Sequence, residues 1–131
     1  MRITKDNINK FIKETIMNCD NKDITQIEYI PDHIKYFYCG GNKLTSLPKL
    51  PEILIRLYCG SNKLTSLPKL PDSLLELYVN NNQLTELPIL PESLKDLDCY
   101  NNNLPYIVTI NNIKEHNKLI KRKKILSKIC V

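Results

Sequence analysis

Residues 67–86 read Leu-Pro-Lys-Leu-Pro-Asp-Ser-Leu-Leu-Glu-Leu-Tyr-Val-Asn-Asn-Asn-Gln-Leu-Thr-Glu, and the chain repeats this pattern every twenty residues. The opening Leu-Pro-x-Leu-Pro block begins at Leu47, again at Leu67 and again at Leu87. The remainder follows Leu-x-x-Leu-x-Cys/Val-x-x-Asn-x-Leu in every copy. A fixed period of this length predicts a solenoid, in which each repeat forms one coil and stacks on the next.

Each repeat contains a short segment in which apolar and polar residues alternate. Leu57 and Cys59 alternate with Arg56 and Tyr58, and a period of two is that of a β-strand. Stacked copies of this strand would form a parallel sheet whose inward side chains build the core. The inward positions are Phe37, Leu57, Leu77, Leu97, Cys39, Cys59, Val79 and Cys99.

Prolines and asparagines shape the rest of each coil. The two prolines of each Leu-Pro-x-Leu-Pro block fix φ and remove backbone donors, so we expect an extended, polyproline-like convex side. One asparagine follows each strand, and its side-chain amide can both donate and accept hydrogen bonds. We therefore expect a structural Asn ladder that satisfies turn backbone groups, made of Asn42, Asn62, Asn82 and Asn102.

The four full repeats lie in residues 27–106 and are flanked by atypical ends within one domain. In residues 1–26, Ile8, Phe11 and Ile12 lie at helical spacing, which predicts an N-terminal helical cap before a degenerate half-repeat. Covers of this kind are expected because a solenoid exposes its core at both ends.

The C-terminal segment, residues 107–131, begins with a half-repeat that keeps two leucine positions as Ile107 and Ile110. A helix is predicted from Asn111 or Asn112 almost to the C-terminus. This segment carries seven basic residues and one acidic residue, so the net charge of +5 belongs to it and not to the repeats.

The repeat resembles the short bacterial-type leucine-rich repeats of the YopM and IpaH effectors. Residues 67–86 match that unit at every defining position, and the resemblance covers about 27–106. Similar repeats occur in predicted proteins of giant viruses that infect amoebae, whose bias toward Ile, Asn and Lys this chain shares. The resemblance implies an α/β leucine-rich repeat solenoid that binds another protein, usually on its concave sheet.

Two features depart from the resemblance. IpaH effectors carry a large ubiquitin-ligase domain after the repeats, whereas 25 residues follow Tyr106 here, so we expect no enzymatic activity. Three of the four strands carry cysteine where valine is usual. Buried reduced thiols are the favoured interpretation, because in-register neighbours lie ~4.8 Å apart, farther than the ~3.8 Å between Cβ atoms that a disulfide prefers.

A metal site or a disulfide remains the alternative for these cysteines, and Cys130 is the one expected to be reactive. We expect no metal and no cofactor, because one row of thiols cannot surround zinc tetrahedrally. His33 and His116 have no catalytic partner at a suggestive spacing and are expected on the surface or in a cap. The chain also contains no phosphate-cradling glycine motif, so we expect no catalytic residue.

The positions that vary between repeats form two outward columns on the predicted sheet. Tyrosine and arginine dominate interface hot spots, so these columns are the candidate partner-binding residues. The alternative is that the aromatic side chains only support the sheet. The columns are Tyr36, Arg56, Glu76 and Asp96, and Tyr38, Tyr58, Tyr78 and Asp98.

The basic tail allows a second interpretation. On a helix, Lys118–Lys128 would place apolar residues on one broad side and most lysines on the other, which can bind anionic lipid or nucleic acid. The favoured alternative is a helix that caps the last coil. No signal peptide and no membrane-spanning run is found in the sequence, so we expect an intracellular protein with an unidentified protein partner and no small-molecule substrate.

Overall fold

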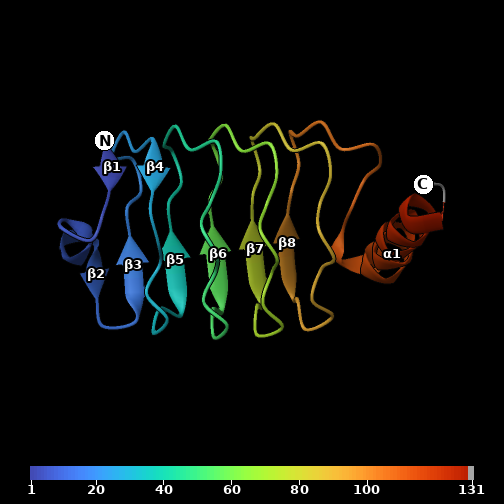
Figure 1. Ribbon diagram of the computed structural model, residues 1–131, viewed down its shortest axis with the longest axis horizontal. Coiled ribbons are helices and arrows are strands. Elements are labelled where there is room, and N and C mark those ends of the chain that lie inside the picture. The colour runs from blue at the N-terminus through green and yellow to red at the C-terminus, as the bar shows by residue number, and fades with distance from the viewer. Residues whose placement is uncertain (130–131) are drawn as a thin grey trace.

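A computed structural model describes residues 1–129 as a solenoid whose strands stack along one axis (Figure 1). Six strands form the main sheet in the order β2-β3-β5-β6-β7-β8, and a separate parallel pair is formed by β1 and β4. A single α-helix, α1, follows the last coil. The strands are β1 (Arg2–Ile3), β2 (Ile12–Lys13), β3 (Ile16–Asn18), β4 (Gln26–Ile27), β5 (Tyr36–Tyr38), β6 (Arg56–Tyr58), β7 (Glu76–Tyr78) and β8 (Asp96–Asp98), and the helices are a 3-10 turn at Ile8–Phe11, a second at Ile110–Asn112 and α1 (Ile113–Ile129).

The twenty-residue period becomes the register of the sheet. Arg56 pairs with Glu76, Leu57 with Leu77 and Tyr58 with Tyr78, and the other repeat strands pair in the same way. Because the register is in step with the repeat, inward leucines stack on inward leucines, and most of them are fully buried. The predicted leucine-rich repeat solenoid with parallel strands is confirmed, and residues 44–54, 64–74 and 84–94, which form the return legs, contain neither helix nor strand.

The Asn ladder connects each coil to the coil before it. The Asn62 side-chain oxygen accepts a hydrogen bond from the Leu44 amide at 3.0 Å. Its side-chain nitrogen donates to the carbonyls of Cys39 at 2.9 Å and Cys59 at 3.2 Å. Asn42, Asn82 and Asn102 make the same set of bonds. The four asparagines therefore join consecutive coils through their side chains.

The N-terminal end differs from the expected helical cap. Ile8–Phe11 forms only a 3-10 turn, and the chain continues into an antiparallel hairpin of β2 and β3. Met17 of β3 pairs with Phe37, so residues predicted as a half-repeat include the strand of a first coil. The helix prediction was wrong because the spacing of Ile8, Phe11 and Ile12 fits a helix locally, whereas an added antiparallel strand covers the exposed edge of β3.

The C-terminal half-repeat also departs from its expected register. Ile107 is 81% exposed and Ile110 is 37% exposed, whereas Val108, between them, is 6% exposed. Without the prolines of the other return legs, this segment turns inward one position out of register, and the Val108 carbonyl accepts a bond from the Cys99 thiol at 3.2 Å. The predicted C-terminal helix is confirmed, although Thr109 acts as the N-cap of the short 3-10 turn that precedes it.

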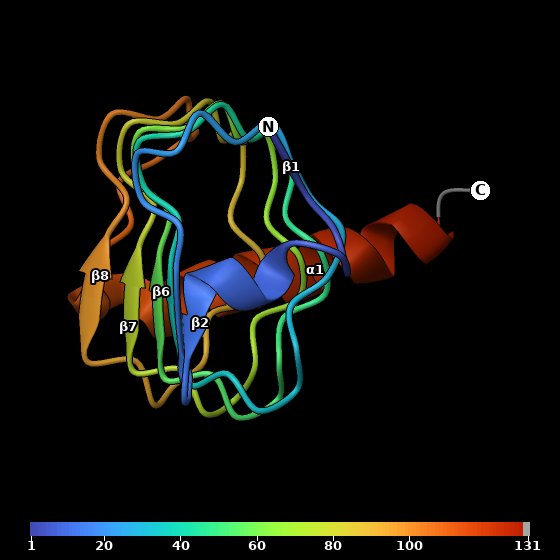
Figure 2. The same ribbon diagram turned by 90° about the vertical axis from the view of Figure 1, so that its left-hand side faces the viewer.

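Helix α1 lies across the C-terminal end of the solenoid (Figures 1 and 2). The Asn117 side chain accepts from the Leu90 amide and donates to the Leu90 carbonyl, both at 2.8 Å. His116 Nε2 lies 2.9 Å from the Pro88 carbonyl, and its Nδ1 lies 2.6 Å from the Tyr106 hydroxyl. Since a carbonyl can only accept, His116 Nε2 donates to the Pro88 carbonyl. The cap thus rests on the return leg.

Replacing Asn62 with alanine tests the ladder. The change leaves the Leu44 amide buried without a partner and removes one of the two side-chain donors to the Cys39 carbonyl, so we expect the free energy of unfolding to fall by about 1–3 kcal/mol in urea titrations. Asn102→Ala is the matched control, because Asn102 makes equivalent bonds at the more exposed end of the solenoid. We expect Asn102→Ala to lower the free energy of unfolding less than Asn62→Ala does. An equal fall in the two variants would contradict the account, in which the loss is larger where the unpaired backbone group is more deeply buried.

Candidate protein-interaction surface

The eight predicted partner-binding residues lie on the outer face of the six-stranded sheet, in two rows that cross β5 to β8. Burial alternates along the strands, since Phe37 and Leu57 point inward and their neighbours point outward. The first row pairs Tyr36 with Arg56, Glu76 and Asp96 in succession, and the second pairs Tyr38 with Tyr58, Tyr78 and Asp98. This set of eight residues is called the outer-face cluster below.

The second row carries a continuous aromatic strip. The rings of Tyr58 and Tyr78 are stacked in parallel with centroids 4.3 Å apart. The rings of Tyr38 and Tyr58 meet edge to face at 5.0 Å. All three side chains are half-buried. Rings held by one another lose little side-chain entropy when a partner binds, which favours a preorganised contact surface.

The centre of the outer-face cluster is held by a carboxylate. Glu76 accepts a hydrogen bond from the Tyr58 hydroxyl at 2.7 Å and forms an ion pair with Arg56. The Arg56 guanidinium also lies over the Tyr36 ring, 5.3 Å from its centroid. These contacts lock four neighbouring side chains into one arrangement and neutralise the charges of Arg56 and Glu76 locally.

The hydroxyls of Tyr58 and Tyr78 remain protonated donors around neutral pH. Partial burial and the hydrogen bond to Glu76 raise the pKa of Tyr58. The hydrogen bond from Tyr78 to Asp96, 3.1 Å long, raises the pKa of Tyr78, and partial burial adds to this effect. Both carboxylates therefore face neutral phenols.

The last strand makes one end of the outer-face cluster acidic. Within the described chain, residues 1–129, neither Asp96 nor Asp98 forms an ion pair with a basic side chain. Asp98 accepts only a long bond of 3.4 Å from the Tyr100 amide. Uncompensated negative charge is thus concentrated at β8.

Strand β3, which pairs with β5, was not predicted from the sequence, and neither were its two outward residues. Ile16 pairs with Tyr36 and is 41% exposed, and Asn18 pairs with Tyr38. They extend the two rows by one strand toward the N-terminus. The signal was present, because Met17 and Cys19 stand twenty residues before Phe37 and Cys39.

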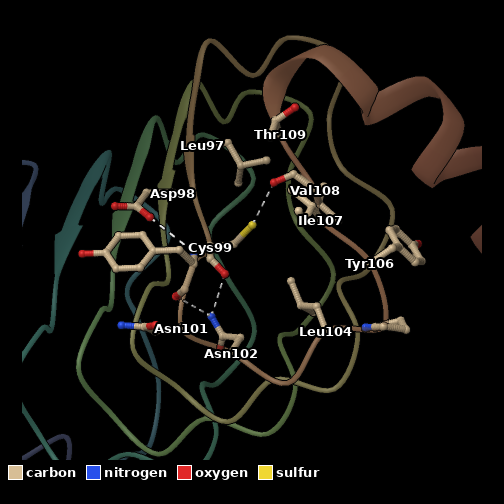
Figure 3. A pocket seen from close by; sticks show the side chains of 12 residues that line it. Leu97, Asp98, Cys99, Asn101, Asn102, Leu104, Tyr106, Ile107, Val108 and Thr109 are labelled. Carbon is tan, nitrogen blue, oxygen red and sulfur yellow. Dashed lines mark hydrogen bonds between the residues drawn. The ribbon is translucent and has the colours of Figure 1, made fainter.

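A pocket opens at the C-terminal end of the sheet (Figure 3). Its volume is about 640 Å³, and it is called the end pocket below. In Figure 3, Leu97 and Cys99 lie on one side, and Leu104 and Val108 lie on the other. Leu97 and Leu104 are only partly buried, whereas the equivalent leucines of the preceding coil are fully buried. The core of the last coil is therefore open.

The cysteines that the sequence predicts to point inward lie in the core of the solenoid. Cys19, Cys39 and Cys59 are fully buried and Cys99 is 7% exposed, each as a free thiol. Burial raises the pKa of Cys19 to about 12 and that of Cys99 to about 11, with help from Asp20 and Asp98 respectively, and burial raises the pKa of Cys39 well above its usual range. The thiols of Cys19, Cys39 and Cys99 are therefore protonated and poorly nucleophilic near neutral pH.

The remaining candidates for a reactive or metal-binding site are Cys130 and the two histidines. Cys130, expected to be reactive, lies outside the described residues. Within residues 1–129, no group of three or more His, Cys, Asp or Glu side chains is placed to hold a metal ion. His116 is buried in the C-terminal cap, as predicted for a cap residue, and His33 is exposed.

The fold can be compared with solved structures. YopM from Yersinia enterocolitica WA-314 is similar with a TM-score of 0.61 and 30% identity, over 79% of this chain and 28% of that chain. A Shigella effector leucine-rich repeat domain is similar with a TM-score of 0.57 and 29% identity, over 81% of this chain and 60% of that chain. The chain is a leucine-rich repeat protein of the short bacterial type. It thus has the architecture of a protein-interaction repeat module.

The chain spans 28% of the length of YopM and 60% of the length of the Shigella domain. No model of a protein family and no curated protein matches the sequence. In the part of the chain that the structure describes, no helix is long and apolar enough to cross a membrane.

Proposed function

We propose that this chain is a non-enzymatic interaction module that binds a protein partner through the outer-face cluster. The observation that carries the proposal is the preorganised strip of Tyr38, Tyr58 and Tyr78. Such rings offer a large apolar area with hydroxyls at the rim, the composition typical of interface hot spots.

The charges of the cluster favour one orientation of the partner. Arg56 and Glu76 neutralise each other, whereas Asp96 and Asp98 have no basic partner within residues 1–129. A partner with basic groups over β8 and apolar groups over the tyrosine strip would match this arrangement. Charge complementarity of this kind chiefly raises the association rate and selects the register.

The size of the surface favours a moderate affinity. Six strands spaced ~4.8 Å apart span about 24 Å, and the repeat strands are only three residues long. The face of the sheet is therefore smaller than the area of roughly 800 Å² that a standard interface buries on each partner. A flexible or small partner, or several copies acting together, would fit this area better than a large rigid one.

A photo-crosslinking experiment tests the outer face directly. A benzophenone amino acid replaces Tyr78 in one variant and Lys69, exposed on the return leg, in the control. We expect Tyr78 to capture a specific partner from a lysate of the source cells, and Lys69 not to capture it. Equal capture from both positions would contradict the proposal.

The captured partner then permits a quantitative test. Tyr58→Ala with Tyr78→Ala is expected to weaken its binding at least about tenfold, measured by calorimetry on purified proteins. Unchanged affinity would show that the tyrosines only support the sheet. Tyr58→Phe, which keeps the ring and loses the hydroxyl, separates the stacking contribution from the bond to Glu76.

A second function is favoured by the outer half of α1. The buried residues of this helix, Ile113, His116, Asn117 and Ile120, lie on one side. Leu119, Leu126 and Ile129 are 40%, 50% and 71% exposed, and at 100° per residue they lie on the opposite side. Capping therefore does not account for this second apolar stripe.

The second stripe fits an anionic lipid surface better than nucleic acid. Arg122 lies among its apolar residues, and long cationic side chains can reach phosphates while their stems contact acyl chains. From Lys118 to Ile129 the helix carries six basic residues and no acidic ones. A nucleic acid would use the charge but leave the apolar stripe uncovered.

Vesicle co-sedimentation tests this second function. We expect the chain to bind vesicles with 30% phosphatidylserine at about 50 mM salt, and pure phosphatidylcholine vesicles far less. Leu126→Gln with Ile129→Gln should abolish most of the binding, while Ser127→Gln, off the stripe, should not. Retention on heparin or DNA that the double variant leaves unchanged would assign the charge to polyanions instead.

A further inference from the structure

The backbone amides that follow each strand donate to the next coil along the solenoid. The Cys59 amide donates to the Tyr78 carbonyl at 2.8 Å, and the Ser61 amide donates to the Asn80 carbonyl at 2.9 Å. Val79 and Asn81 repeat this pattern toward Asp98 and Tyr100. Each coil is thus completed by acceptors from its neighbour.

The last coil has the same donors without the neighbour. Cys99 and Asn101 occupy the equivalent positions, and within residues 1–129 their amides have no hydrogen-bond acceptor. The Leu84 amide donates to the Asn102 side chain, but the Leu104 amide has no such asparagine among the described residues. Strand β8 is also the edge of the sheet. Among the described residues, the last coil therefore lacks the hydrogen-bond acceptors that a following coil supplies elsewhere.

The end pocket adjoins these free donors. Helix α1 covers the return-leg half of the coil, where Leu87 and Leu90 are each 1% exposed. The strand half is left open, with Leu97 and Leu104 partly buried around a cavity of about 640 Å³. An added strand would find a row of backbone donors and an apolar cavity at the spacing of one more coil.

The negative charge at the β8 edge indicates which kind of segment would bind there. Asp96 and Asp98 project from the outer side of the same edge, and neither has a basic partner among residues 1–129. In this sheet, Arg56 pairs laterally with the carboxylate of Glu76 on the adjacent strand. A basic residue on an added strand would meet Asp96 in the same relation.

We propose that this end of the solenoid binds one extended segment of a partner protein, which adds as a strand parallel to β8. An apolar side chain of the segment enters the end pocket, and a basic side chain beside it contacts Asp96 or Asp98. Backbone pairing supplies affinity, and these two side chains supply specificity. The site uses the sheet edge and is independent of the outer-face function proposed above.

A single extended segment fits this site better than a second solenoid. Helix α1 crosses the same end of the molecule, so a rigid body stacked flush on the last coil would collide with it (Figure 2). One strand occupies only the open half beside the helix. A second copy remains an outcome that the experiment distinguishes.

The repeat itself supplies a probe. A peptide with the sequence of residues 54–62, with valine in place of Cys59, matches a further coil in register. Its arginine would lie beside Asp96 and its second leucine beside Leu97. Its tyrosine and glycine carbonyls and its final asparagine would face the amides of Cys99, Asn101 and Leu104.

The test is a titration of the folded chain with this peptide, followed by fluorescence anisotropy and by amide NMR shifts. We expect saturable, salt-sensitive binding that shifts the amides of Cys99, Asn101 and Leu104. Aspartate in place of the peptide's second leucine should weaken binding at least about tenfold. In the chain, Asp96→Lys and the pocket-filling Leu104→Trp should do the same, and the melting temperature checks that both variants fold.

The matched control is Tyr58→Ala, which lies on the outer face and should leave peptide affinity unchanged. No binding up to millimolar peptide would overturn the proposal, as would shifts confined to the tyrosine strip. Concentration-dependent self-association that the peptide inhibits would assign the edge to a second copy instead and also overturn it.

Discussion

Stacking in register is the constraint on which the rest of this molecule depends. A twenty-residue coil has one short strand and an extended return leg, so it cannot enclose its own apolar side chains. It also leaves buried amides and carbonyls that no residue within the coil can satisfy. Stacking of neighbouring coils meets the first need, and the Asn ladder meets the second, because each asparagine binds backbone groups of its own coil and of the coil before it. A coil therefore becomes stable only with a neighbour on each side.

This dependence separates the residues that maintain the fold from those that are free to vary. Inward leucines, cysteines and the ladder asparagines are confined by packing and hydrogen bonding. The outward positions of each strand carry no such demand, and there the copies differ most, from Tyr36 and Arg56 to Glu76 and Asp96. The same logic makes the ends special. The N-terminal end is closed by the β2 strand, whereas α1 closes only half of the C-terminal end.

The interior of the solenoid could be predicted from the sequence because its rule is periodic. A residue twenty positions away occupies the same environment, so the inward rows, the Asn ladder and the outward columns followed from spacing alone. The ends obey no period. Residues 8–12 were misread as a helix because local spacing does not report that β3 needs an edge partner. The inward turn of Val108 likewise depends on the contact with Cys99.

Features of the candidate sites differ in the same way. The tyrosine strip was visible in the sequence, but its ring stacking and the shared Glu76 were not, because they depend on side-chain rotamers across strands. The position of α1 over half of the last coil depends on the hydrogen bonds of Asn117 with Leu90 and of His116 with Pro88. These partners lie 27 and 28 residues earlier in the chain, so no local sequence pattern predicts them. The open end pocket is a consequence of that docking, and only the folded chain reveals it.

Hydrogen exchange of individual backbone amides tests the central claim that each coil is completed by the next. The amides of Leu44, Leu64 and Leu84, bound by the asparagine of the following coil, are predicted to exchange only through unfolding of the solenoid. The amide of Leu104 is predicted to exchange orders of magnitude faster. Exchange of Leu64 at the rate of Leu104 would contradict the account.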